Sequence, residues 1–216
     1  MDIDISLVGM EKGSQYETII TSLCDDGSKN AAPFGTIAYS KDELMFRIFK
    51  TSLTASNIYN RREFVVNITN KPQIFTLSTI GNLTEEYFTD DKEAILKDCD
   101  AYLKCEVETL KEACKKHDPV ASNGKSYIIK AKVTKIVKNK ACPQIVNRGL
   151  YMLIESLVNY TRIDIVDDEL KRYYLDRFSE DQRVIKKVGT KDDKESIEIL
   201  KKVLENKGYK IKNFEP

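Results

Sequence analysis

The sequence predicts a mainly β protein with helices at its C-terminal end: a six-stranded antiparallel barrel followed by a helical portion. Two observations predict this fold. Up to about residue 140, apolar and polar side chains alternate with the period of two that strands require, and after Pro143 apolar side chains recur with the helical period of 3.6. We therefore expect a barrel domain over residues 1–140 and a helical portion over residues 141–216.

The first three predicted strands form an antiparallel meander. They are the runs "ETIITSL", "NAAPFGTIAYS" and "ELMFRIFK", separated by two short turns, the first of which contains Asp26 and Gly27. Both faces of the third strand are largely apolar, so we expect the barrel core to cover one face and a helix or a second subunit to cover the other. The first face carries Leu44, Phe46 and Ile48, and the second carries Met45, Arg47 and Phe49.

Three further strands complete the predicted barrel. They are "EFVVNIT", "AYLKCEVETL" and "SYIIKAKVTKIV", with a turn at Asn123 and Gly124 before the last one. In the fifth strand, strict alternation predicts that Leu103, Cys105, Val107 and Thr109 face inward.

Two segments between the strands carry other patterns. The stretch "KTSLTASNIYNRR" predicts a short helix of about two turns with Thr51 or Ser52 as its N-cap. The stretch "NKPQIFTLSTIGNL" predicts a helical segment, and we expect the acidic run of residues 84–100 that follows it to be an exposed loop.

Three helices are predicted after Pro143. The first, "NRGLYMLIESLVNYTRI", has an apolar face made of Leu150, Leu153, Ile154, Leu157, Val158 and Thr161. The opposite polar stripe either faces solvent or points toward a cofactor pocket; it comprises Arg148, Tyr151, Glu155, Asn159 and Arg162. The other helices are "DDELKRYYLDRFSEDQRVIKKV" and "DDKESIEILKKVLEN", the second of which ends at Gly208.

Composition excludes several classes of function. With 35 basic and 34 acidic residues the net charge is +1, which gives no footprint for nucleic acid or a membrane surface. No apolar run approaches the roughly 20 residues that span a bilayer, and "MDIDISLVGM" lacks the order of a signal peptide, so we expect a cytoplasmic protein. The absence of any G-x-G argues against a Rossmann fingerprint and a P-loop.

The cysteines and the single histidine predict neither a metal site nor acyl-transfer chemistry. The five cysteines contain no C-x-x-C pair, and their odd number in a cytosolic chain indicates free thiols. A metal site would have to use Cys105, Cys114 and His117, which have no standard spacing, so we predict none. A Ser-His-Asp hydrolase would have to use His117, which lies in a polar stretch.

The strand-to-helix junction "FRIFKTSLTASN" carries the residue types that bind a phosphate. Arg47 and Lys50 are cationic, and the hydroxyl groups of Thr51, Ser52 and Thr54 stand at the predicted helix start, where free backbone N–H groups favour an anion. Two interpretations stay open. Either these residues hold a phosphomonoester, or the hydroxyls only cap the helix while the cations are solvated.

Two quoted motifs resemble those of a known family, the FMN-binding split-barrel flavin reductases. "NAAPFG" followed by "TSLTASNIYNRREFVVNIT" is similar to that family's Asn-x-Ala-Pro strand, its Lys-x-Thr-x-x-Asn-Ile segment and its Glu-Phe-Val-Val-Asn strand. "YETIIT", "NAAPFGT" and "NRGLYMLIESLVNYTRI" resemble more closely a mainly archaeal branch of the superfamily. The resemblance covers roughly residues 8–165 and is strongest over 16–69.

The resemblance implies a split barrel that binds FMN. Thr54 with Ser52, Thr51, Lys50 and Arg47 would hold the phosphate, and Asn57 would brace that loop. The flavin ring would lie along residues 31–36, which are Ala31, Ala32, Pro33, Phe34, Gly35 and Thr36. Pro33 also has a simpler interpretation as the mark of a barrel edge.

The function implied by the resemblance is that of an FMN-dependent oxidoreductase that works as a homodimer and takes electrons transiently from NADH or NADPH. Two departures bear on this, because Leu53 replaces the family's frequent Asp and Gly35 replaces its usual Ser. Neither removes the phosphate site, but reductase activity does not follow from it. The alternatives are a non-catalytic flavin carrier or sensor, and a barrel that uses a deazaflavin.

Overall fold

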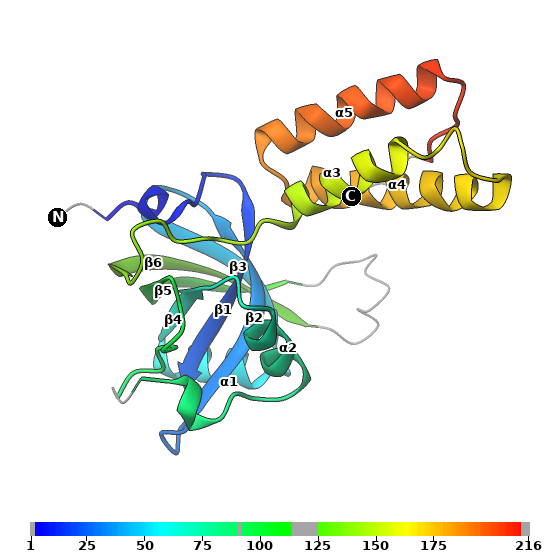
Figure 1. Cartoon of the computed structure of the whole chain (residues 1–216). Helices are drawn as coiled ribbons and strands as arrows, with labels where there is room; N and C mark the ends of the chain where they lie inside the picture. Colours follow the sequence, from blue (N-terminus) through cyan, green and yellow to red (C-terminus); the bar gives the residue numbers. More distant parts are fainter. Residues whose placement is uncertain (1–2, 90–91, 114–124, 213–216) are drawn as a thin grey trace. The chain divides into compact units, whose positions relative to one another are not determined.

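The computed structural model describes residues 3–89, 92–113 and 125–212. Its contacts divide the chain into two units, Met1–Val146 and Asn147–Pro216, and each is described by itself (Figure 1). Residues 141–146 contact the first unit, since the N–H of Glu17 donates to the carbonyl of Val146 at 2.8 Å. The turn predicted at Asn123 and Gly124, and with it Cys114 and His117, lies outside the described residues.

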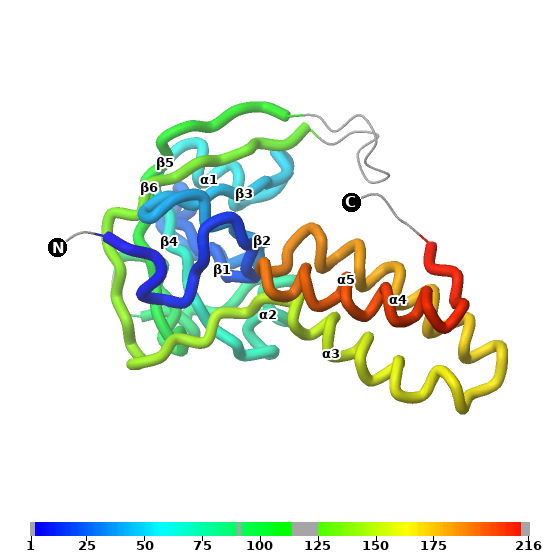
Figure 2. The backbone as a smooth tube through the Cα atoms, turned by 90° about the horizontal axis from the view of Figure 1, so that it is seen from above, coloured from blue at the N-terminus to red at the C-terminus, as the bar shows by residue number. Residues whose placement is uncertain are grey.

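The first unit is the predicted six-stranded antiparallel barrel. Its strands pair in the closed order β1-β2-β3-β6-β5-β4, and every pairing is antiparallel (Figures 1 and 2). A 3₁₀ turn, Ile5–Val8, precedes them. The strands are β1 (Gln15–Leu23), β2 (Lys29–Ala38), β3 (Glu43–Phe49), β4 (Glu63–Ile68), β5 (Ala101–Ala113) and β6 (Ser126–Lys138).

The two faces of β3 divide as the alternation predicts. Leu44, Phe46 and Ile48 are buried in the barrel core, where the ring of Phe46 meets that of Phe64 edge-on at 5.4 Å. Their neighbours point outward: Met45 and Arg47 are half-buried, and Phe49 is 44% exposed. The inner face therefore builds the core, while the outer face keeps exposed apolar surface.

The prediction that Thr109 faces inward was wrong. Leu103 and Cys105 are buried in the core and Val107 packs against it, but Thr109 is exposed and Leu110 packs inward in its place. The β5–β6 register shifts between Val107 and Thr109, so one extra residue enters the strand there. Such a bulge reverses the alternation beyond it, because side chains follow a period of two.

The described residues of the run 84–100 form a loop, as predicted, but the expectation that this loop is exposed was wrong. This run follows α2 (Pro72–Ile80) and a 3₁₀ turn, Glu85–Tyr87, and its acidic side chains alternate with apolar ones that are buried. Four of its buried residues, Phe88, Ala94, Leu96 and Cys99, join Ile19, Ala31, Ile74 and Leu83 in a second core outside the barrel. High acidity concealed this apolar set in the sequence.

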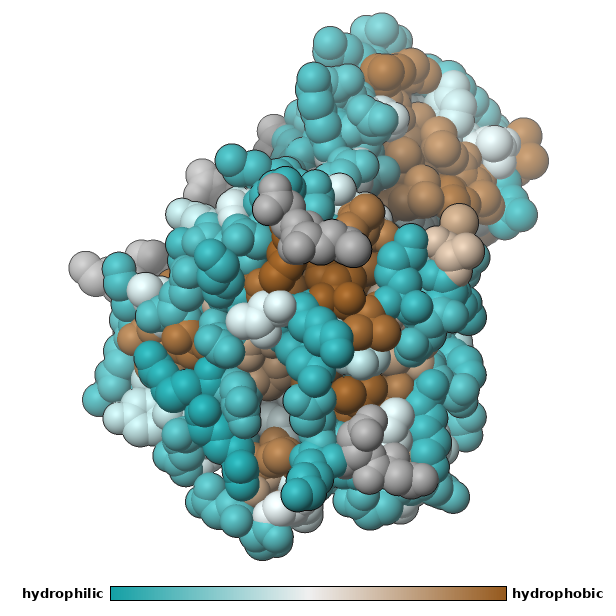
Figure 3. Space-filling model, turned by 90° about the vertical axis from the view of Figure 1, so that its left-hand side faces the viewer, coloured by the Kyte–Doolittle hydropathy of each residue, from teal (hydrophilic) through white to brown (hydrophobic). Residues whose placement is uncertain are grey.

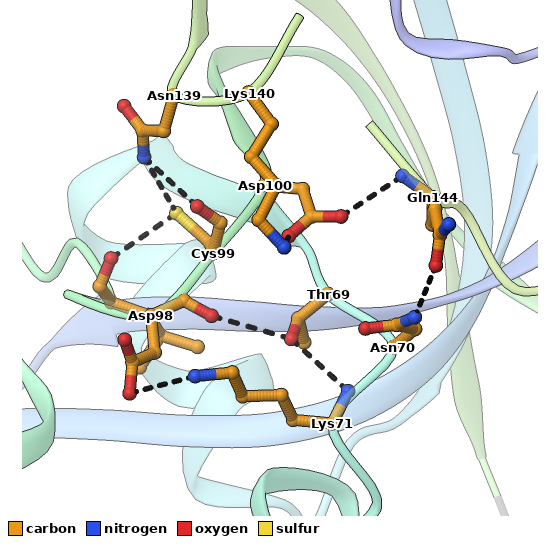
Figure 4. A network of polar contacts seen from close by, with 10 residues as sticks. Thr69, Asn70, Lys71, Asp98, Cys99, Asp100, Asn139, Lys140 and Gln144 are labelled. Atoms are coloured by element: carbon orange, nitrogen blue, oxygen red, sulfur yellow. Dashed lines mark hydrogen bonds and ion pairs between the residues drawn. The ribbon is translucent and has the colours of Figure 1, made fainter. Parts of the chain in front are cut away.

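A polar network holds one end of the barrel together (Figure 4). Asp100 is 2% exposed, accepts a hydrogen bond from the backbone N–H of Gln144 at 3.0 Å, and forms an ion pair with Lys140 at 2.6 Å. The amide of Asn139 donates to the carbonyl of Cys99 at 3.0 Å. These contacts fix residues 139–144, which follow β6, against the start of β5.

The second unit contains the three predicted helices, α3 (Arg148–Tyr160), α4 (Asp168–Val188) and α5 (Lys191–Asn206). Each begins at a side-chain N-cap, supplied by Asn147, Asp167 and Thr190 respectively. Gly208 follows the last helix with φ of 87°, a left-handed conformation that suits glycine. Their shared core is Leu153, Ile163, Phe178, Ile185, Ile197, Leu200 and Leu204.

Most of the predicted apolar face of α3 is not part of this core. Leu153 is buried, but Leu150 is 49% and Ile154 46% exposed, and Leu157 and Val158 are exposed as well. The helix turns a narrower face with Gly149 and Ser156 inward, and Figure 3 shows hydrophobic side chains gathered on the surface of the helical unit. Within the described ranges no helix is both long and apolar enough to cross a bilayer.

Candidate functional site

The predicted cofactor residues surround a place where two neighbouring strands part. β2 and β3 pair only at Ile37 with Met45 and at Ala38 with Leu44. Beyond these pairs, residues 29–36 of β2 remain paired with β1, and residues 46–49 of β3 remain paired with β6. We call this parted stretch the split.

The backbone of odd-numbered β2 residues faces the split. The N–H and the carbonyl of Ala38 bond Ser14 and Gly13 on the β1 side, so even positions point toward β1. The N–H of Ala31 instead points to the opposite side, where it donates to the amide oxygen of Asn82 at 3.0 Å. Strand backbone groups alternate in direction, so Pro33 and Gly35 present theirs to the split as well.

Two side chains adapt this strand edge. Asn82, from the loop after α2, bonds the N–H of Ala31 and also donates its amide to the carbonyl of Lys29 at 2.9 Å, as a neighbouring strand would. Pro33 has no N–H, so it leaves no donor unpaired at this edge. Asn82 was not predicted from the sequence, because a position after a glycine in a loop carries no signal for such a role.

Gly35 lies under the side chain of Gln15. A Cβ built on Gly35 would come within 2.1 Å of the Gln15 amide nitrogen, so any larger residue would displace that side chain. The glycine therefore serves the close approach of Gln15, which sequence analysis did not identify.

The side chains of residues 31–36 do not share one environment. Phe34 packs against the barrel core, and Thr36 is fully buried with its hydroxyl 2.8 Å from that of Thr18. Ala31 belongs to the second core outside the barrel. Ala32 is half-buried on the inner face, like Phe34. It is the backbone of this segment, more than its side chains, that is presented to the split.

Helix α1 (Leu53–Arg61) begins beside the split, and Ser52 is its N-cap. The Ser52 hydroxyl accepts from the N–H of Ala55 at 3.2 Å and donates to the carbonyl of Phe49 at 2.9 Å. No acceptor among the described residues takes the N–H groups of Leu53 and Thr54. These two donors at a positive helix end are the groups that an anion would bind.

Thr54 and Asn57 attach α1 to the strands. The amide of Asn30 donates to the Thr54 hydroxyl at 2.8 Å, which joins α1 to β2. The amide of Asn57 donates to the Ser22 hydroxyl at 3.0 Å, which joins α1 to β1. All four side chains are buried. Asn30, the first residue of the "NAAPFG" motif, was missing from the predicted site.

The two predicted cations are both half-buried but have different surroundings. The Lys50 ammonium pairs with Glu112 on β5 and lies 4.9 Å from the centre of the Tyr127 ring. The hydrogen bond from Lys50 to Glu112 raises the pKa of Lys50, so this group stays charged at neutral pH. Arg47 lies on the outer face of β3, 6.0 Å from the centre of the Phe49 ring. Thr51 is exposed between Lys50 and the helix.

The residues present fit a phosphate-bearing cofactor at the start of α1. Two first-turn N–H groups, the hydroxyls of Thr51 and Ser52 and the nearby cation Lys50 belong to consecutive residues. The parted backbone edge at Pro33 and Gly35 offers hydrogen-bonding groups to a flat ring. The hydroxyl of Thr54 accepts from Asn30 and keeps its own hydrogen for a further acceptor.

Metal chemistry receives no support from the described residues, where no group of three His, Cys, Asp or Glu side chains is placed to hold an ion. Two cysteines are buried thiols. Burial raises the pKa of Cys99 to about 11, and complete burial raises that of Cys105 further.

A separate pocket of about 180 Å³ lies on the outer face of β1, β4 and β5, and none of the predicted cofactor residues lines it. The split is a parted strand edge and this pocket is a hollow, so the two are distinct features of the first unit.

Family comparison covers most of the chain. The N-terminal domain of the family described as "Protein of unknown function (DUF447)" matches residues 16–138. The companion DUF447 model matches residues 147–202. The two matches correspond to the barrel and to the three helices.

Three solved structures are similar to this chain, and the first of them shares its fold. FMN-bound protein MM1853 from Methanosarcina mazei, itself assigned to DUF447, is 22% identical, covers 93% of this chain and 100% of its own, with a TM-score of 0.52. The styrene monooxygenase flavin reductase SMOB from Pseudomonas putida S12 is 13% identical. The match covers 62% of this chain and 84% of SMOB, with a TM-score of 0.48. An FMN-binding protein from Thermus thermophilus is 10% identical. The match covers 58% of this chain and 71% of that protein, with a TM-score of 0.45.

Proposed function

This chain belongs to the DUF447 family, and from that premise we propose that it binds FMN in the split and acts as a flavin-dependent oxidoreductase. The observation that carries the proposal is the junction of a parted strand edge with the start of α1, where two N–H groups lack acceptors among the described residues. The FMN bound to the Methanosarcina mazei protein supports the choice of cofactor.

In this proposal the phosphate lies at the first turn of α1. The N–H groups of Leu53 and Thr54 and the hydroxyls of Thr51 and Thr54 donate to its oxygens, while Lys50 supplies positive charge. Ser52, whose hydroxyl donates to the carbonyl of Phe49, holds the turn in place. Arg47, on the adjacent outer face of β3, adds a second cation. Asn57 contributes indirectly, because its bond to Ser22 holds α1 in place.

The flavin ring in this proposal lies along β2. The backbone groups of Pro33 and Gly35 that face the split orient the polar edge of the ring. Bound FMN would supply the electron-transfer chemistry, and the chain supplies binding, orientation and exclusion of water. We expect NADH or NADPH to bind only transiently as the electron donor, since the sequence has no dinucleotide fingerprint.

We also propose that the protein is a cytoplasmic homodimer. The outer face of β3 and β6 exposes Phe49 at 44% and Ile128 at 38%, with half-buried Met45 beside them. A second copy of the chain would cover this apolar surface and close the split. The free thiols of Cys24, Cys99, Cys105 and Cys142 suit the reducing cytoplasm.

A titration with FMN and with riboflavin tests the cofactor and the phosphate site together. We expect FMN to bind at least about tenfold more tightly, because riboflavin lacks the group that the α1 start would hold. Equal affinity for the two would contradict the phosphate assignment. If the protein bound neither FMN nor riboflavin but bound a deazaflavin, the deazaflavin would replace FMN as the proposed cofactor.

Anaerobic mixing of the FMN-loaded protein with NADH and with NADPH tests the oxidoreductase part. Bleaching of the flavin absorption band by either donor is the expected result. A flavin that stays oxidised with both donors would favour the carrier or sensor alternative.

A further inference from the structure

The pocket on the outer face of β1, β4 and β5 is unrelated to the proposed flavin site and is lined by charges of both signs. Its cations are Arg61 and Lys104, and its anions are Glu63, Glu93 and Glu106. Residues Glu93 and Ala94 cross over the strands, held by a hydrogen bond from Thr21 to the carbonyl of Ala94.

Arg61 is the one lining cation that another lining residue does not neutralise. It stands in the last turn of α1, and one terminal nitrogen donates to the carbonyl of Cys24 at 2.7 Å. Its Nε is buried and has no acceptor among the described residues. A ligand in the pocket cannot reach this closed nitrogen, but it can pair with the rest of the guanidinium, and a carboxylate is the acceptor that matches a guanidinium best. Lys104, in contrast, is paired with Glu93.

Two carboxylates in the pocket form no ion pair with any described residue, and the lysine opposite Glu106 on β6, Lys132, pairs instead with Asp42. Glu63 and Glu106 are directly opposite each other in the β4–β5 pairing, and neither forms an ion pair within the described part of the chain. Directly opposed side chains on neighbouring strands have Cβ atoms about 5 Å apart, so these like charges repel. An ammonium group placed between them would remove that repulsion.

We propose that this pocket binds a small zwitterion, whose carboxylate pairs with the guanidinium of Arg61 and whose ammonium lies between Glu63 and Glu106. A simple anion is disfavoured by the three lining carboxylates, and a simple cation by the guanidinium. A volume of about 180 Å³ holds a molecule slightly larger than benzene, which fills an apolar cavity of about 150 Å³, so the ligand has about six to nine non-hydrogen atoms.

Calorimetric titration and thermal unfolding with 4-aminobutyrate, butyrate and butylamine test this assignment on the full chain. We expect 4-aminobutyrate to bind and to raise the unfolding temperature, and the two single-charge analogues to do neither. Arg61→Gln should weaken binding at least about tenfold, since it removes a charge-assisted hydrogen bond. Arg62→Gln is the matched control, because Arg62 is adjacent and exposed but does not line the pocket.

Glu106→Gln provides a second variant, because this exposed strand residue can be changed without disturbing the Cys24 contact. It should weaken binding of 4-aminobutyrate while leaving the unfolding temperature of the ligand-free chain nearly unchanged. The proposal fails if the wild-type chain does not bind 4-aminobutyrate, if butyrate binds equally well, or if both variants bind 4-aminobutyrate as tightly as the wild type does. None of these results depends on whether FMN binds in the split.

Discussion

Thr54 is the residue at which a structural and a cofactor role meet. Its buried hydroxyl accepts from Asn30 and its backbone N–H points out of the first turn of α1. We expect Thr54→Ala to lower FMN affinity by roughly ten- to a hundredfold, because the hydroxyl, which accepts from Asn30 and keeps its own hydrogen, can then no longer donate to the phosphate. Fluorescence titration of FMN measures the change, and circular dichroism reports the fold.

Thr54→Ser is the control for this prediction, since it keeps the hydroxyl and should bind FMN nearly as the wild type does. If Thr54→Ala loses helical signal along with FMN, the residue acts through its link to Asn30. That result would favour the interpretation in which the hydroxyls only stabilise the helix start. Unchanged affinity in a folded Thr54→Ala protein would remove Thr54 from the site.

Asp100 links the acid stability of the barrel to one buried carboxylate. Burial acts to raise the pKa of Asp100, but the hydrogen bonds from Lys140 and from the N–H of Gln144 outweigh it and hold this pKa below its usual value. A depressed carboxyl pKa stabilises the fold above the unfolded pKa of about 3.9, and this stabilisation is lost as pH falls through the folded pKa.

We therefore expect Asp100→Asn to lower the free energy of unfolding at pH 7 by about 1.5 to 3 kcal/mol. The difference from wild type should shrink as the pH falls below about 4, where the wild-type carboxyl takes up a proton. Urea denaturation of both proteins at several pH values measures it. A pH-independent difference would show that Asp100 acts through packing and not through its charge.

At the scale of elements, the sequence predicted what local patterns encode and missed what depends on pairing. The strands and helices were confirmed, and Ser52 proved to be the N-cap of α1. The reversed facing of Thr109 could not be foreseen, because a bulge is set by the register between β5 and β6. The buried side chains of residues 84–100 could not be foreseen either, because the surface they cover is assembled from distant segments.

The candidate site shows the same division. The hydroxyls and cations at the start of α1 could be identified because they are contiguous in sequence. Asn82 and Gln15 could not, since each reaches β2 only through the tertiary fold. The direction of the β2 backbone toward the split also follows from pairing, which no single-chain pattern contains.

Helix α5 depends on a reciprocal cap at its first turn. The Thr190 hydroxyl accepts from the N–H of Asp193 at 3.2 Å, and the Asp193 carboxylate accepts from the N–H of Thr190 at 2.9 Å. Thr190→Ala should destabilise the helical unit by about 1 kcal/mol, because the first turn loses its acceptor. Chemical denaturation followed by circular dichroism measures this, and Thr190→Ser should recover most of the loss.

For the whole molecule, the proposed dimer connects assembly to cofactor binding. Phe49→Asp or Met45→Asp would place a charge on the apolar outer face of β3 and should give monomers that retain little FMN. Ile80→Asp on α2 is the control, since that side chain is 77% exposed and lies outside this face. Light scattering gives the mass. A wild-type mass near the 24.8 kDa of one chain, with FMN fully bound, would contradict the dimer.

The parted strands also bear on the solubility of the chain. A strand edge with free N–H and carbonyl groups is a template on which another chain can add a strand, and such addition begins aggregation. Here the two donor positions that precede Gly35 on that edge are closed, because the N–H of Ala31 is bonded to Asn82 and Pro33 has none. An incoming strand would find no regular ladder to continue, so β2 can stay open to a ligand without recruiting a second chain into its sheet.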